Sequence, residues 1–170
     1  MKKCVFLDRD GVINEDRGDY TYRVADFKIQ PGVIEAIRKL KEAGFLIVVV
    51  TNQAGISKGL YTIEQMDECH RYFQQAAGNK IDKIYYCPYH PTITESLARK
   101  PDTLMLEKGI AKFSIDPQQS WMVGDAERDI ESGLKMGLKT IRISRDHQED
   151  TKAHYTEQSL LQAVNKWIIR

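Results

Sequence analysis

The stretch CVFLDRDGVIN, residues 4–14, places a short apolar run directly before two aspartates and a glycine. The run Cys4–Leu7 predicts a buried β-strand. Asp8 and Asp10 follow it two residues apart, and in an extended chain residues at this spacing point to the same side. Gly11 allows the chain to turn there without a clash from a Cβ atom. The sequence therefore predicts a strand that ends in two neighbouring carboxylates, an arrangement that is costly unless they share a cation or a proton.

Further short runs rich in β-branched residues indicate more buried strands, and segments with helical periodicity lie between them. The expected strands are residues 46–50, 84–87, 121–123 and 140–143, and the expected helices are residues 31–44, 62–77, 104–113, 125–137 and 156–169. Strands that alternate with helices require right-handed crossovers and a parallel sheet covered on both faces. We expect an α/β fold, a Rossmann-like three-layer sandwich with a mainly parallel sheet, as a single domain over residues 1–170.

Composition excludes several classes of protein. The 170 residues include 25 Lys and Arg against 24 Asp and Glu, so the chain lacks the basic excess of a nucleic-acid binder. The longest apolar stretch, residues 45–50, is far too short to span a membrane, and Asp8 interrupts the first apolar run too early for a signal peptide. Three irregularly spaced cysteines suit reduced thiols. We expect a cytoplasmic protein, a monomer, with no membrane or nucleic-acid partner.

The expected strand ends carry a set of residues that suits phosphoryl transfer through a covalent aspartate. An open parallel sheet binds its ligands at the carboxyl ends of the strands. Asp8 would attack phosphorus, and Asp10 would protonate the leaving alkoxide and then activate water. Thr51 and Lys100 would hold the phosphoryl oxygens. Asp8 and Asp125 supply the hard oxygen ligands that Mg²⁺ prefers, and the cation would offset the charge of a phosphate dianion.

These motifs resemble those of the haloacid dehalogenase-like superfamily. The four counterparts are DRDGV at residues 8–12, TN at 51–52, KP at 100–101 and GD at 124–125. A narrower set of ordered blocks is similar to the D-glycero-D-manno-heptose-1,7-bisphosphate phosphatases and the related histidinol-phosphate phosphatases: DRDGVIN at 8–14, VVTNQAGI at 49–56, YYCPYHP at 85–91, RKP at 99–101 and MVGD at 122–125. The likeness runs from about Cys4 to Ile143.

The resemblance implies a fold without a large cap domain, Mg²⁺ dependence, and the main-chain carbonyl of Asp10 as a further metal ligand beside Asp8 and Asp125. It also implies removal of the C7 phosphate from a phosphorylated sugar, heptose 1,7-bisphosphate, in nucleotide-heptose synthesis for lipopolysaccharide. Arg99 would recognise the second phosphate or the sugar. The other residues expected to bind substrate are Asp16, Arg17, Gly18, Asp19, Thr51, Asn52, Gln53, Ala54 and Lys100.

Two departures from the family pattern limit what carries over. Many members hold structural Zn²⁺ through C-x-H followed by C-x-C, a tetrahedral site. Here Cys87 matches, but Tyr89 stands in the histidine position and no cysteine follows it, so we expect no structural zinc. Several relatives place a lysine after the last motif aspartate, where this chain has Ala126. Lys58 is one candidate for the missing cation.

Several alternatives stay open on sequence grounds. The substrate could be histidinol phosphate or another small phosphomonoester, and the anomer of the heptose is undetermined. A receiver-like signalling domain also combines a parallel sheet, Mg²⁺ and a phosphorylated aspartate, although receivers carry the acceptor after the third strand. Asp129 suits either the N-terminal turn of a helix or the surroundings of a metal. We expect three of the four histidines, His70, His147 and His154, to lie at the surface.

Overall fold

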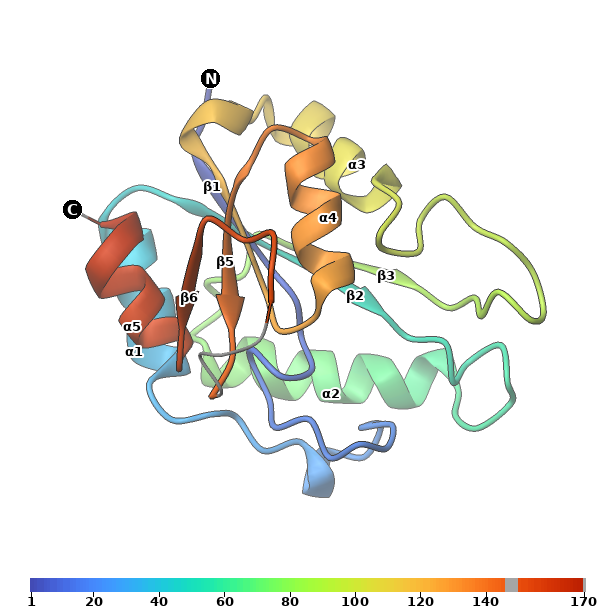
Figure 1. Cartoon of the computed structure of the whole chain (residues 1–170). Helices are drawn as coiled ribbons and strands as arrows, with labels where there is room; N and C mark the ends of the chain where they lie inside the picture. The colour runs from blue at the N-terminus through green and yellow to red at the C-terminus, as the bar shows by residue number, and fades with distance from the viewer. Residues whose placement is uncertain (146–149, 170) are drawn as a thin grey trace.

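A six-stranded parallel sheet forms the centre of the computed structural model, which describes residues 1–145 and 150–169 (Figure 1). The strands follow the order β3-β2-β1-β4-β5-β6. Their bounds are β1 Cys4–Leu7, β2 Leu46–Asn52, β3 Lys83–Cys87, β4 Trp121–Gly124, β5 Lys139–Ile143 and β6 Tyr155–Glu157. The five expected strands are all present, and the predicted parallel α/β architecture is confirmed.

The strand order reverses beside β1, and this reversal locates the site. From β1 the chain proceeds outward through β2 to β3 and then returns to β4 on the other side of β1. Leu7 of β1 is paired in register with Val123 of β4, and the Asp8 N–H donates to the Val123 carbonyl at 2.9 Å. The loops that leave β1 and β4 therefore diverge from neighbouring points. Open α/β sheets bind ligands at such a switch point.

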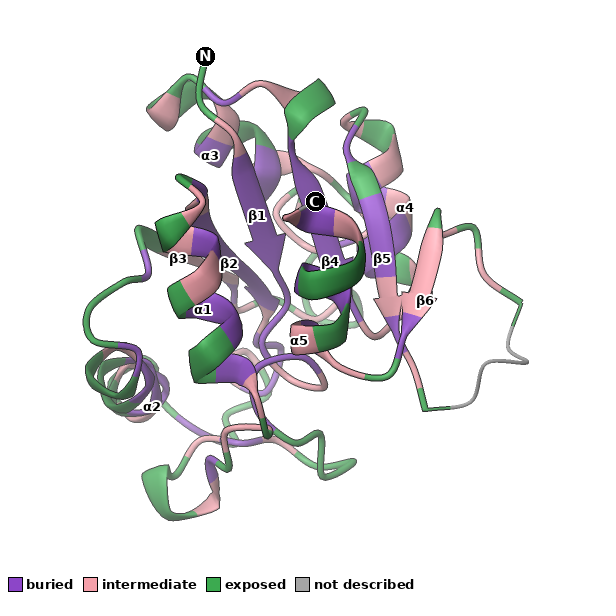
Figure 2. Cartoon of the chain, turned by 90° about the vertical axis from the view of Figure 1, so that its left-hand side faces the viewer, coloured by how far each residue is buried: buried purple, intermediate pink, exposed green. Residues whose placement is uncertain are grey.

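Helices cover both faces of the sheet and complete the three layers. The bounds are α1 Val33–Glu42, α2 Ile63–Ala76, α3 Leu104–Phe113, α4 Glu127–Lys135 and α5 Leu160–Ala163. Side chains of α1, α2 and α5 share one apolar core with β1, whereas α3 contributes to a second core on the other face. Figure 2 shows the buried strands between these helices. No described helix is long and apolar enough to cross a membrane.

Two helix ends are fixed by the residues that the sequence singles out. The Thr62 side chain accepts from the Gln65 N–H at 3.3 Å, and the Gln65 side chain accepts from the Thr62 N–H at 3.0 Å, which completes the expected capping box of α2. Gly44 follows α1 at a φ of 79°, a conformation that glycine adopts without a Cβ penalty.

The structure corrects the prediction at both edges of the sheet. The strand expected at residues 84–87 is an edge strand, so Cys87 is its one fully buried residue. The last expected helix does not begin at Thr156, because β6 occupies residues 155–157 and α5 begins only at Leu160. Ser159 caps α5 by accepting from the Gln162 N–H, and the chain continues as a π-helix over Val164–Ile168.

The surface position predicted for His70 is also wrong. This side chain is buried, and its Nε2 atom lies 3.4 Å from Arg9 Nη1. It belongs to the inward face of α2, together with Met66, Cys69 and Phe73. Burial and the neighbouring arginine lower the pKa of His70 to about 3, so the ring is neutral at physiological pH. His154 is exposed as expected, and His147 lies outside the described residues.

Candidate active site

The carboxyl edge of the sheet brings the predicted catalytic residues together. Asp8 directly follows β1, and Asp125 directly follows β4. Thr51 is the penultimate residue of β2. Lys100 reaches the same edge from the loop before α3. The side chains of Asp8, Thr51 and Lys100 are buried, and Asp125 is half-buried.

Lys100 is held by three oxygen atoms at the centre of this cluster. Its Nζ atom lies 2.7 Å from Asp8 Oδ1, 2.7 Å from Asp129 Oδ1 and 2.7 Å from the main-chain oxygen of Val50. Lys100 is 2 % exposed. Burial alone would lower the pKa of the ammonium group, but the Asp129 and Asp8 carboxylates outweigh it and raise the pKa above the ordinary value. Lys100 is therefore a fixed positive charge beside Asp8.

The sequence places Asp129 either in the N-terminal turn of a helix or near a metal, and the structure shows its contacts. Its Oδ2 accepts from the Ala126 N–H at 3.1 Å, which caps the start of α4. Its Oδ1 is the partner of Lys100. Gly124 is required for this close approach, because a Cβ atom at that position would lie 2.2 Å from the Cβ of Asp129. Asp129 therefore positions the lysine, a contact that spacing along the chain cannot reveal.

Burial and neighbouring carboxylates disfavour the ionisation of Asp8 and Asp125. Burial, then the charges of Asp129 and Asp125, raise the pKa of Asp8 to about 7, although Lys100 opposes the shift. Burial and Asp129 likewise raise the pKa of Asp125 to about 6. One lysine therefore does not compensate this cluster in full, and the remaining negative charge attracts protons or a cation.

The same three carboxylates fit a divalent cation. Asp8, Asp125 and Asp129 each offer an oxygen atom, and these atoms all lie within 4.8 Å of one another. Asp125 Oδ1 is buried without a hydrogen-bond partner among the described residues, and such an acceptor suits coordination of a cation. A Cβ atom at Gly11 would lie 2.1 Å from Asp125 Oδ2, so the glycine makes room for this carboxylate. Carboxylate oxygens are the ligands that Mg²⁺ and Ca²⁺ prefer.

Asp10 is oriented by groups on both of its carboxylate oxygens. Oδ1 accepts from Arg9 Nη2 and from Asn14 Nδ2, each at 2.9 Å. Oδ2 accepts from Gln53 Nε2 at 3.1 Å. Arg9 is 1 % exposed and also donates to the Thr21 carbonyl at 2.7 Å. Sequence reasoning missed Arg9 and Asn14, although both belong to the conspicuous motif at residues 8–14.

Asn52 contacts the main chain of Lys100 in both directions. Its Nδ2 donates to the Lys100 carbonyl at 3.2 Å, and its Oδ1 accepts from the Lys100 N–H at 3.1 Å. This pair of bonds fixes the loop that carries the lysine against the end of β2. A contribution of Asn52 to substrate binding stays a prediction.

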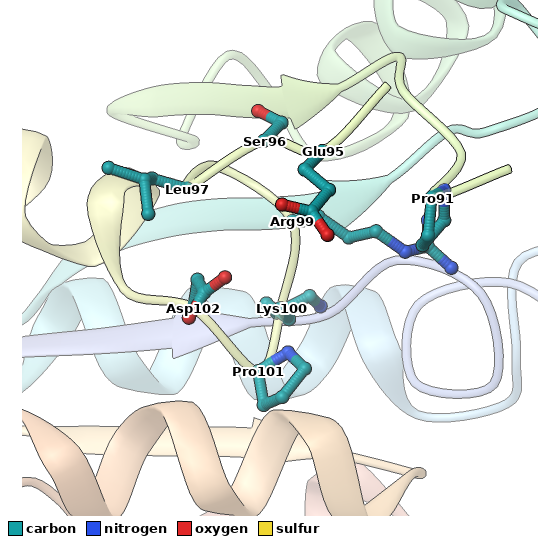
Figure 3. A pocket seen from close by; sticks show the side chains of 8 residues that line it. All are labelled: Pro91, Glu95, Ser96, Leu97, Arg99, Lys100, Pro101 and Asp102. Carbon is teal, nitrogen blue, oxygen red and sulfur yellow. The ribbon is translucent and has the colours of Figure 1, made fainter. Parts of the chain in front are cut away.

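Arg99 and Lys100 line one cavity of about 490 Å³ (Figure 3). The other lining residues are Pro91, Glu95, Ser96, Leu97, Pro101 and Asp102. The Arg99 side chain extends toward Pro91 in Figure 3, and its Nη1 atom donates to the Tyr89 carbonyl at 3.2 Å. The cavity therefore brings a second basic residue beside Lys100, although Asp8, Thr51 and Asp125 do not line it.

The loop at residues 16–19 is exposed, and its members differ in position. Asp16 lines a second cavity of about 490 Å³ together with Gly11 and Asp125. Arg17 is directed to Asp26, with 2.7 Å between Nη1 and Oδ1. Gly18 and Asp19 form the turn of the loop, where the Gly18 N–H donates to Asp16 Oδ1 at 2.9 Å.

Two more residues singled out by the sequence are Lys58, the candidate for the cation absent at position 126, and Ala54. The Lys58 ammonium group donates to the Tyr20 hydroxyl at 3.1 Å, so it is engaged at the loop beside the site. Ala54, expected to line the substrate pocket, is buried.

This chain is similar to a family of hydrolases and to several phosphatases. Residues 7–143 match the family model described as haloacid dehalogenase-like hydrolase. A D-glycero-D-manno-heptose-1,7-bisphosphate 7-phosphatase of Chlorobaculum tepidum is 35% identical, over 98% of this chain and 94% of the relative. A D-glycero-beta-D-manno-heptose-1,7-bisphosphate 7-phosphatase of Haemophilus influenzae is 38% identical, over 82% of this chain and 79% of the relative. The fold is similar to that of a D,D-heptose 1,7-bisphosphate phosphatase from B. bronchiseptica complexed with magnesium and phosphate, with a TM-score of 0.85, 23% identity and 96% of each chain covered.

Proposed function

Because this chain belongs to the haloacid dehalogenase-like hydrolases, we propose that it removes the C7 phosphate of D-glycero-D-manno-heptose 1,7-bisphosphate. Its relatives at 35% and 38% identity carry that activity in their names. The chain is a phosphomonoester hydrolase, and we assign its place to nucleotide-heptose biosynthesis. The domain lacks a large cap and its charge is balanced, so we expect a monomer.

The observation that carries the proposal is the buried contact between Lys100 and Asp8 at the switch point of the sheet. A buried carboxylate is a usable nucleophile toward phosphorus only when nearby positive charge offsets the repulsion from the phosphoryl oxygens. Lys100 provides one such charge. Asp8 and Asp125, with the main-chain carbonyl of Asp10, would hold Mg²⁺, which when bound neutralises phosphoryl charge.

The residues then divide two chemical steps between them. Asp8 attacks phosphorus as the ester bond to the C7 oxygen breaks, and the departing oxygen takes a proton from Asp10. Asp10 next takes a proton from water as that water attacks the phosphorus of the aspartyl phosphate, which regenerates Asp8 and releases orthophosphate. Thr51 and Lys100 hold the phosphoryl oxygens through both steps.

We assign recognition of the second phosphate to Arg99. It shares the cavity of about 490 Å³ with Lys100, a volume within the usual range for small-molecule sites. A guanidinium group binds phosphate through two parallel hydrogen bonds, which suits discrimination between a bisphosphate and a monophosphate.

The test is phosphate release with Mg²⁺ across a panel of substrates, compared by kcat/KM. The panel contains both anomers of heptose 1,7-bisphosphate, fructose 1,6-bisphosphate, histidinol phosphate and an aryl phosphate. A preference of about 10²-fold or more for a heptose anomer, equal to about 2.7 kcal/mol, supports the proposal. A preference for histidinol phosphate would reassign the substrate, and a phosphoaspartate that persists for minutes would favour a receiver-like signalling role.

A further inference from the structure

Gln53 joins two of the proposed catalytic side chains through one amide group. Its Nε2 atom donates to Asp10 Oδ2 at 3.1 Å and to Thr51 Oγ1 at 2.8 Å. The residue is 2 % exposed, so protein groups hold its side chain. Because the Thr51 hydroxyl oxygen accepts a hydrogen bond from Gln53, the hydroxyl proton stays available for another acceptor, such as a phosphoryl oxygen.

Tyr61 determines which way this amide faces. Its hydroxyl donates to Gln53 Oε1 at 2.6 Å. Burial raises the pKa of Tyr61 above its usual value, so the phenol remains a donor. A reversed amide would turn its oxygen toward the Asp10 carboxylate and place two acceptors against each other. Tyr61 and Asp10 together therefore permit one orientation of Gln53.

The Tyr61 ring is itself fixed by its neighbours. It stacks on Tyr22 with ring centres 5.1 Å apart and an angle of 5° between the planes, and it lies 5.8 Å from the ring of Tyr20. A Cβ atom at position 55 would lie 2.2 Å from Tyr61 Cε1, so Gly55 is needed for the ring to occupy this place. Tyr20 directly follows the exposed loop at residues 16–19.

We propose that Tyr61 is a positioning residue that acts through Gln53 on the Asp10 carboxyl group. The inference rests on the proposed phosphatase function, in which Asp10 gives a proton to the leaving oxygen. Arg9 and Asn14 both donate to Asp10 Oδ1, whereas Oδ2 accepts from Gln53 and keeps a lone pair for the exchanged proton. Gln53 then sets where Oδ2 lies.

The test separates substrates by how much their leaving group needs a proton. An alkyl phosphate releases a strongly basic alkoxide and depends on the acid, whereas a nitrophenyl phosphate releases a stable phenolate and depends on it little. Tyr61→Phe keeps the ring stack and removes the donor. We expect kcat/KM for heptose bisphosphate, which reports the steps up to the aspartyl phosphate, to fall roughly tenfold, and kcat/KM for p-nitrophenyl phosphate to change by less than about twofold.

Tyr22→Phe is the matched control, because it makes the same change in the same aromatic cluster at a hydroxyl that is paired with Arg23 instead of Gln53. It should leave both rates near those of the wild type. Equal losses on the two substrates in Tyr61→Phe, or the same losses in Tyr22→Phe, would overturn the inference. If the wild type prefers another alkyl phosphate, the proposed substrate is wrong, and that ester replaces the heptose in the same comparison.

A second readout needs no turnover. The side-chain amide resonance of Gln53, assigned by its disappearance in Gln53→Leu, should shift in Tyr61→Phe and stay in place in Tyr22→Phe. A Gln53 resonance that is unchanged in Tyr61→Phe would refute the coupling even in a protein without phosphatase activity.

Discussion

Lys100→Met removes the buried ammonium group from its two carboxylate partners. Asp8 and Asp129 each lie 2.7 Å from Lys100 Nζ, and the lysine is almost entirely buried. Removal of one partner from a buried ion pair leaves uncompensated charge and costs roughly 3–5 kcal/mol, whereas an exposed pair contributes about 0–1 kcal/mol. We therefore expect the free energy of unfolding of the metal-free protein at pH 8 to fall by about 3–5 kcal/mol.

The loss of unfolding free energy in Lys100→Met should become smaller as the pH falls. The pKa of Asp8 is raised to about 7 even with Lys100 opposing the shift, so removal of the lysine raises it further. A carboxyl group whose pKa is higher in the folded state binds its proton there more tightly, and this stabilisation disappears as the pH rises through the folded-state value. At pH 5 the variant can protonate Asp8, and the difference from the wild type narrows.

Urea unfolding in EDTA at several pH values between 5 and 8 measures both effects. Lys135→Met is the matched control, because Lys135 is half exposed and lies 3.9 Å from Asp102. It should change the free energy of unfolding by less than about 0.5 kcal/mol. A loss below about 1 kcal/mol for Lys100→Met at pH 8, or an equal loss at pH 5 and pH 8, would refute the view that Lys100 compensates the buried carboxylates.

Other predictions test the metal, the nucleophile, the recognition residue and the zinc assignment. Mg²⁺ should raise the Tm more at pH 8 than at pH 5, because protons compete with the cation at Asp8 and Asp125. Burial raises the pKa values of these two residues to about 7 and about 6. A Mg²⁺-induced shift in Tm that is the same at both pH values would contradict this prediction. Asp8→Asn should abolish phosphate release without lowering the Tm, and substantial residual turnover would remove Asp8 as nucleophile. Arg99→Ala should lower kcat/KM for the bisphosphate by about 10²-fold and for an aryl phosphate far less, whereas equal losses would argue against phosphate recognition. Metal analysis after dialysis against a weak chelator should find no stoichiometric zinc, and about one equivalent would overturn the reading of Cys87 and Tyr89.

The sequence predicts the sheet well where the strands are buried on both faces. The run of apolar residues in β1 and β2 leaves no other interpretation, and the acids and hydroxyl that follow these strands identify the edge that carries the site. The pattern fails at the margins of the sheet. β6 has three residues and one buried side chain, Glu157, so it lacks the apolar run that marks a strand.

The burial of His70 could have been predicted from the helical spacing of its apolar neighbours. Met66, Cys69, His70 and Phe73 are spaced as the inward face of a helix, and the structure buries all four. Residue type favoured the surface, but position in the helix decided the outcome. Asp129 and Tyr61 are different cases, because their partners are a lysine on another loop and an amide beyond a turn, and such contacts depend on the folded arrangement of several segments.

The charge of the cluster explains why this edge of the sheet suits a metal-dependent phosphatase. When Asp8, Asp125 and Asp129 are ionised, Lys100 leaves the cluster with a net charge of two negative units. Without a cation the site reduces this charge by binding protons, as the raised pKa values of Asp8 and Asp125 indicate. A protonated Asp8 is a poor nucleophile, since attack on phosphorus requires the carboxylate. A divalent cation held by these carboxylates would remove the same excess and leave Asp8 ionised, so in the proposed mechanism cation binding would also activate the nucleophile.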